Sequence, residues 1–123
     1  MGCDLTMRRL VLAGALALAA SQANALPASF DGEWAVDVRT TVGDCQPEIA
    51  GTVTVQGGHV VAVSGAAIEA WGYIENNGDL SARFTQGQAM LRAQGKLKGK
   101  TGAGAWSSNT NYCGGKWTAR RAN

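Results

Sequence analysis

The feature that most restricts the fold of this chain is a series of short runs in which apolar and polar residues alternate. Glycine or asparagine turns break the runs about every 8–12 residues, a spacing typical of β-sandwiches and β-barrels. Alternation with period two places successive side chains on opposite faces of a strand, whereas an amphipathic helix needs period 3.6. No run after residue 25 has the helical period. This part of the chain is therefore predicted to be all-β.

About eight strands follow from this pattern, separated by turn sequences such as Gly57-Gly58 and Asn76–Asp79. They are predicted over residues 32–40, 51–56, 59–64, 67–75, 80–86, 89–97, 103–108 and 115–121. Short links favour an antiparallel meander, and closure into a small up-and-down barrel removes exposed edges. A two-sheet sandwich explains the same pattern and remains the alternative.

The alternation also predicts which side chains form the core. The residues expected to face inward are all large and apolar: Trp34, Val36, Val38, Val53, Val55, Ile68, Ile74, Leu80, Phe84, Leu91 and Trp117.

The first 25 residues have the order of a secretory signal peptide. Met7–Arg9 is a short positive region, Leu10–Ala20 is an uncharged apolar run, and Ala23–Ala25 is a cleavage site of the A-x-A type. The apolar run is shorter than the roughly 20 residues that span a bilayer. We therefore predict a signal peptide over 1–25 and one all-β domain over 26–123, with no membrane span.

Two other interpretations of the N-terminus exist. Met1–Thr6 fits the loose pattern for N-myristoylation, but an acylated start would leave the signal peptide unexplained. Met7 can also be the true start, with Met1–Thr6 as an upstream extension.

The cysteines agree with export. Cys3 leaves with the signal peptide, so Cys45 and Cys113 are the one possible pair in the mature chain. An oxidising compartment would join them in a disulfide, which predicts a periplasmic or secreted protein.

The charge balance excludes a typical nucleic-acid binder. The whole chain has a net charge of +2, and loss of Arg8, Arg9 and Asp4 leaves nine basic and eight acidic residues, a net charge of about +1. Lys96, Lys98 and Lys100 alternate, which we interpret as a solvent or edge face kept soluble by lysine, although such a row could also meet an anionic surface.

No catalytic constellation or metal site is recognisable, and no cofactor is expected. The one histidine, His59, follows a turn, where an exposed histidine is ordinary. The carboxylates are scattered, and Gly102-Ala103-Gly104 lacks the helix and lysine of a phosphate-binding loop. The sequence therefore predicts a protein that is not an enzyme.

The candidate binding residues are aromatic. Trp71 and Tyr73 alternate with small residues that look like core, so they are expected on the outer face, where exposed aromatics are over-represented at binding sites. Tyr112, in the last long loop, would join them if that loop lies at the same end. The other interpretation is that Trp71 and Tyr73 pack on neighbouring side chains such as Arg83.

Four stretches carry a resemblance to a known family: Phe30–Trp34, Gly43–Cys45, Gly99–Trp106 and Cys113–Arg121. In these stretches, which are spread along nearly the whole mature chain, the protein resembles an uncharacterised family of small exported proteins of rhizobia and related bacteria. The pattern G-x-W followed by C-G-G-x-W-x-A-R-R is its most specific part. The resemblance implies a compartment, the periplasm or the exterior, and no mechanism.

The Gly32-Glu33-Trp34 opening is also similar to that of small eight-stranded ligand-binding barrels of the avidin and lipocalin types. The favoured hypothesis is a monomeric, non-enzymatic module of the cell envelope that binds an unknown protein or small-molecule ligand. The alternatives are a barrel-type inhibitor of a secreted protease and an enzyme whose site is not recognisable.

Overall fold

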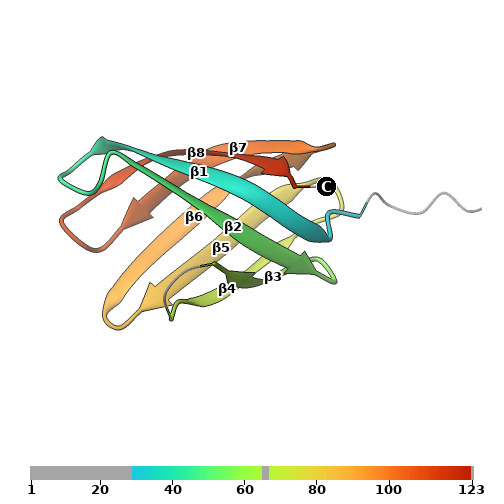
Figure 1. Cartoon of the computed structure of the whole chain (residues 1–123), viewed down its shortest axis with the longest axis horizontal. Helices are drawn as coiled ribbons and strands as arrows, with labels where there is room; N and C mark the ends of the chain where they lie inside the picture. Colours follow the sequence, from blue (N-terminus) through green and yellow to red (C-terminus); the bar gives the residue numbers. More distant parts are fainter. Residues whose placement is uncertain (1–28, 65–66, 123) are drawn as a thin grey trace, which may run out of the picture.

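The computed structural model describes residues 29–64 and 67–122, which form a closed barrel of eight antiparallel strands in chain order (Figure 1). The strands are β1 (Gly32–Val42), β2 (Glu48–Gln56), β3 (His59–Val63), β4 (Glu69–Ile74), β5 (Asp79–Gln86), β6 (Ala89–Lys98), β7 (Thr101–Ser108) and β8 (Gly114–Arg121). The all-β, up-and-down barrel is confirmed, and the sandwich is not formed. The predicted signal peptide and its cleavage site lie outside the described residues.

Pairing of the first strand with the last closes the barrel. Trp34 on β1 lies opposite Val53 on β2 and opposite Arg121 on β8. Each of the eight predicted strands is present, and all except β4 share one end with the prediction. β2 begins at Glu48, where it pairs with Arg39, earlier than residue 51. Lys96 and Lys98 do not lie at a sheet edge, because the closed barrel has none. Lys100 was expected to point the same way, but it lies in the β6–β7 turn rather than on a strand.

The segment before β1 lies at one end of the barrel, at the right in Figure 1, and its Phe30 side chain is buried in the core there. The Arg121 guanidinium lies 4.8 Å from the centre of the Trp34 ring and donates to the carbonyl oxygens of Ser29 and Asp31. The Asp31 carboxylate accepts the N–H groups of the β2–β3 turn, Gly57 and Gly58, at 2.9 and 3.0 Å. The two hydrogen bonds lower the pKa of Asp31 below its ordinary value, and the one from Gly58 contributes more than the one from Gly57. Polar contacts thus hold the segment over this end.

Two glycines make room for a tryptophan inside the barrel. A Cβ on Gly95 would lie 2.6 Å from the Trp117 ring, and a Cβ on Gly104 would lie 2.7 Å from its Nε1. The Trp117 indole donates to the carbonyl of Gln94 at 3.1 Å, so its N–H is satisfied within the wall. The ring therefore lies flush against β6 and β7, where any side chain at these two positions would displace it.

The inward faces of the strands agree with the sequence pattern. Trp34, Val55, Ile74 and Trp117 are buried, and the other predicted core residues are half-buried and line the interior: Val36, Val38, Val53, Ile68, Leu80, Phe84 and Leu91. The pattern did not identify several further core residues, namely Phe30, Val60, Ala82, Ala93, Leu97, Trp106 and Ala119. Most of these are small or lie in glycine-rich stretches, where alternation is hard to recognise.

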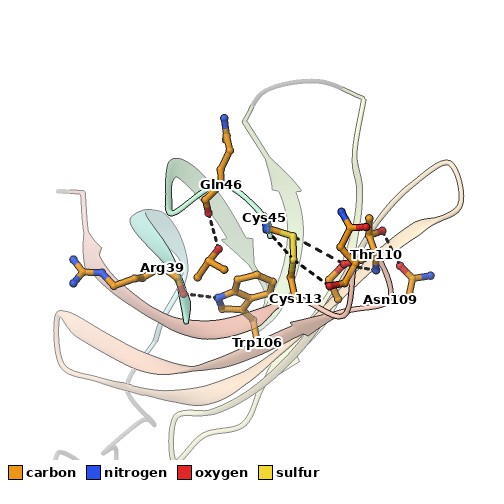
Figure 2. The surroundings of a disulfide bond; sticks show 10 residues. Arg39, Cys45, Gln46, Trp106, Asn109, Thr110 and Cys113 are labelled. Carbon is orange, nitrogen blue, oxygen red and sulfur yellow. Dashed lines mark hydrogen bonds between the residues drawn. A yellow bond between two sulfur atoms is a disulfide. The ribbon is translucent and has the colours of Figure 1, made fainter. Parts of the chain in front are cut away.

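The predicted disulfide between Cys45 and Cys113 is present and joins the β1–β2 loop to the β7–β8 loop (Figure 2). Gly43, with φ of +89°, allows this approach, since a Cβ there would lie 2.8 Å from the Cys113 Sγ. The Asn109 side chain accepts from the Met90 N–H at 2.8 Å and so fixes the same loop to β6. The β1–β2 loop, the β7–β8 loop and the start of β6 are thus joined to one another at this end of the barrel.

Candidate functional site

The barrel encloses an apolar cavity of about 270 Å³. The lining residues come from every strand except β4: Trp34, Val36, Val38, Ile49, Ala50, Gly51, Val53, Val55, Val60, Val63, Ser64, Ile68, Leu80, Ala82, Phe84, Leu91, Ala93, Leu97, Trp106, Trp117 and Ala119. An engineered cavity of roughly 150 Å³ with apolar walls stays dry and binds benzene. The space inside this barrel is therefore large enough for a small organic molecule.

The walls of the cavity offer almost no hydrogen-bonding groups. The three indole N–H groups of Trp34, Trp106 and Trp117 donate to main-chain carbonyls at 2.9–3.1 Å. Ser64 is the one lining residue with a hydroxyl, and its oxygen accepts the N–H of Thr52 at 2.9 Å. Because an unpaired polar group buried among such walls costs free energy, the interior suits an apolar molecule.

Small side chains on neighbouring strands create the space. Ala82 on β5 lies directly opposite Gly72 on β4 and Ala93 on β6, and all three are buried. Ala119 on β8 is a fourth small, buried residue. Three tryptophans fill much of the other side, from β1, β7 and β8. Small side chains among these larger ones thus leave part of the interior unfilled.

The cavity reaches the surface at the end of the barrel that carries the disulfide. Ile49, Ala50 and Ser64 line the cavity and are exposed to solvent. The wall is lowest at β3 and β4, which are the two shortest strands and are joined by the ladder pairs His59–Tyr73 and Val60–Gly72 (Figure 1). At the opposite end Phe30, in the segment before β1, is buried in the core, so among the described residues the cavity opens towards the disulfide end.

The aromatic residues predicted as a binding site are placed on two separate parts of the molecule. Trp71 and Tyr73 lie on the outer face of β4, 55% and 40% exposed, with ring centres 6.0 Å apart in an edge-to-face arrangement. The Arg83 guanidinium lies 5.2 Å from the centre of the Trp71 ring, as the packing interpretation predicted. Tyr112 lies in the β7–β8 loop, beyond β5, β6 and β7 around the wall. The structure does not bring it to the other two.

The Trp71→Ala, Tyr73→Ala double variant tests the outer aromatic pair. At exposed sites an aromatic pair and a cation–π contact contribute about 0.5 kcal/mol each, or about 1 kcal/mol together. We therefore expect the melting temperature to fall by no more than about 8 °C, while any partner that docks on this face is lost in a pull-down from an extract of the producing cells. Tyr112→Ala is the control. A large loss of stability with retained partners would show that the pair is structural.

Tyr112 has an unusual backbone. Asn111 and Tyr112 have φ values of 53° and 49°, in the left-handed region that non-glycine residues rarely adopt. Such conformations cost of order 1–3 kcal/mol each and persist where the surroundings impose them. Here the disulfide at Cys113 and the Asn109 hydrogen bonds fix both ends of the loop. Tyr112 is 89% exposed as a result, on the same end as the cavity entrance.

The groups that could support catalysis remain apart. His59 is exposed at the β2–β3 turn, where its Nδ1 lies 3.1 Å from the Gly57 carbonyl. Within residues 29–64 and 67–122, no three His, Cys, Asp or Glu side chains are grouped closely enough to hold a metal ion. In the same residues no helix is long and apolar enough to cross a membrane.

Fold and site together define a small disulfide-tied β-barrel with an apolar interior that is open at one end. The chain matches no protein-family model and no curated protein. The resemblance to exported proteins of rhizobia therefore stays a prediction, and the function has to be argued from the cavity.

Proposed function

We propose that this protein is a non-enzymatic binding protein that holds a small apolar molecule inside its barrel. The cavity of about 270 Å³ carries this proposal. Its volume lies near the lower limit of ligand pockets, roughly 300–1,000 Å³. A short acyl chain or a compact ring system fits that volume, whereas a long lipid does not.

The one open end determines how the ligand would lie. Its apolar part would contact the tryptophans and the aliphatic walls inside the barrel, from Trp106 near the disulfide end to Trp34 at the other. A polar head would remain at the entrance, within reach of the Ser64 hydroxyl, whose oxygen accepts from the Thr52 N–H and whose proton has no acceptor among the described residues. A singly tailed amphiphile has this distribution of polarity.

A disulfide fits an oxidising location, so we further propose that the protein acts in the periplasm or outside the cell. A binding protein in that compartment would carry or sequester an apolar compound that is poorly soluble in water. Ser29 and Asp31 are held by Arg121. This contact gives no support to the extended, free arm that a protease inhibitor would need.

Filling the cavity tests the proposal. Ala82→Leu adds three carbon atoms to the inner face of β5, between Gly72 and Ala93, where the neighbours are small. In the variant the leucine and a bound probe would compete for the same space, and overpacking of this kind typically costs about 1–3 kcal/mol. We therefore expect the variant to bind an apolar fluorescent probe, such as an N-phenylnaphthylamine, about tenfold more weakly than the wild type.

Ala35→Leu is the matched control, because it adds the same atoms to the exposed outer face of β1. Its probe affinity should equal that of the wild type. Thermal melting verifies that both variants fold. Equal probe binding by Ala82→Leu and the wild type would place the probe outside the barrel and contradict the proposal.

A further inference from the structure

The charges of this chain are divided between its two halves. Residues 29–79 carry eight acidic residues and one arginine, whereas residues 80–122 carry eight basic residues and no acidic one. Because consecutive strands are neighbours in a closed meander, the two halves of the sequence become two sides of the barrel (Figure 1). A net charge near zero therefore hides a strongly basic side.

The basic charges are concentrated on the outer face of β6, β7 and β8, which we call the basic face. Arg92, Lys96 and Lys98 are exposed on β6, and Lys116 and Arg120 are exposed on β8. The strand between them, β7, exposes only small side chains: Thr101, Ala103, Ala105 and Ser107. Two rows of cations about 10 Å apart thus flank β7, a strand with short side chains that is about 26 Å long.

Most of these cations form no ion pair with the described residues, although Asp37 on β1 lies next to the β8 row, opposite Thr118. Within the described part of the chain, Lys96 is the one cation of the basic face in an ion pair, 3.4 Å from Asp79. The other four stay exposed in the two rows on either side of β7, and like charges at such separations repel. An anionic ligand along β7 would relieve that repulsion and be attracted from both sides.

We infer that the basic face binds a linear acidic polysaccharide. Both edges of β7 are fully paired, with β6 and with β8, so an extended peptide cannot add to the sheet there. The large exposed apolar residues of the described chain all lie outside β6, β7 and β8. The face therefore offers neither an aromatic platform for nucleic-acid bases nor an apolar surface for insertion into a lipid layer.

The chemistry of the face matches a polyuronate chain. Carboxylates on alternate sides of such a polymer would face the β6 and β8 rows. Its hydroxyl groups would meet the exposed Thr101, Ser107 and Thr118. The contact is electrostatic and exposed, so its affinity should fall steeply with added salt.

The test uses polygalacturonate as the probe and measures its affinity for the full chain by calorimetry at low and high salt. Arg92→Gln, Arg120→Gln removes one charge from each row, and we expect affinity to fall about tenfold. Arg39→Gln, Arg83→Gln removes the same number of charges from the flanking strands β1 and β5, which do not border β7. Arg39 lies opposite Lys116 but is paired with Glu48 at 2.9 Å, and Arg83 lies opposite Arg92 but is turned to Trp71. This control should bind within about twofold of the wild type.

Four results would overturn the inference. The first is an equal loss of affinity in both double variants, and the second is binding of neutral dextran as strong as that of polygalacturonate. The third is tighter binding, through Arg92 and Arg120, of polyglutamate, single-stranded DNA or phosphatidylglycerol vesicles. The fourth is self-association of the protein that the Arg92→Gln, Arg120→Gln substitutions abolish. Ala82→Leu should keep its polygalacturonate affinity, so failure here is distinguishable from failure of the cavity proposal.

Discussion

Replacing Trp34 with alanine is expected to lower the free energy of unfolding by about 3–5 kcal/mol, which is the usual cost of removing a large buried aromatic side chain. Trp34 is 2% exposed, and its indole donates to the Phe30 carbonyl at 2.9 Å. The Arg121 guanidinium covers the ring and also holds the segment before β1. The alanine substitution would therefore have two effects at once: it would open the covered end of the barrel, and it would enlarge the cavity.

Urea denaturation followed by far-ultraviolet circular dichroism measures this loss without depending on tryptophan emission. Trp71→Ala is the matched control: the same substitution at a side chain that is 55% exposed should cost about 1 kcal/mol or less. Equal effects of the two substitutions would contradict the assignment of Trp34 to the core.

The second large effect is expected from the disulfide. A Cys45→Ser, Cys113→Ser variant should lose about 2–5 kcal/mol of stability, because the bond closes a loop with a sequence separation of 68 and restricts the unfolded chain. The effect should also reach the cavity, since the bond ties two loops at the entrance. Probe binding is therefore expected to weaken even where the variant is fully folded.

Wild-type protein treated with dithiothreitol provides the internal comparison, because reduction and substitution remove the same link. Both samples should unfold at the same, lower urea concentration. An unchanged midpoint in the serine variant would mean that the hydrogen bonds of Asn109 and the strand pairing hold this end without the covalent bond.

The fold was predictable because local alternation and turns carry most of its information. Trp34, Val36 and Val38 alternate with polar residues, and the structure places all three inside. The pairing of Cys45 with Cys113 followed from counting. Closure was harder to predict, because it depends on β1 meeting β8 at the far end of the chain, and a sandwich uses the same alternation.

The cavity could not be predicted from the sequence. Ala82, Ala93 and Ala119 line it from three strands, and each of them alone is an ordinary small residue. Trp106 was missed as a core residue because glycine and alanine precede it and two serines follow it, so no alternation with other large apolar residues is visible. The outward direction of Trp71 and Tyr73 was predicted correctly, but their separation from Tyr112 depends on the order of strands around the barrel.

The division of charge was visible in the sequence, yet it meant little before the strand order was known. In a fold with crossing connections, residues 80–122 would be spread over both sides. The meander keeps them together and places two cationic rows around β7. The structure therefore turns a compositional detail into a surface.

The central claim, an apolar ligand inside the barrel, is tested most directly with the tryptophans themselves. Trp34, Trp106 and Trp117 line the cavity, whereas Trp71 is on the outside. In a Trp71→Phe variant, all remaining emission comes from the cavity walls, and a brominated short-chain fatty acid quenches an indole only on contact. We predict saturable quenching that ends at one ligand per protein and is weakened by Ala82→Leu. Emission that stays constant while the ligand is added would contradict the claim.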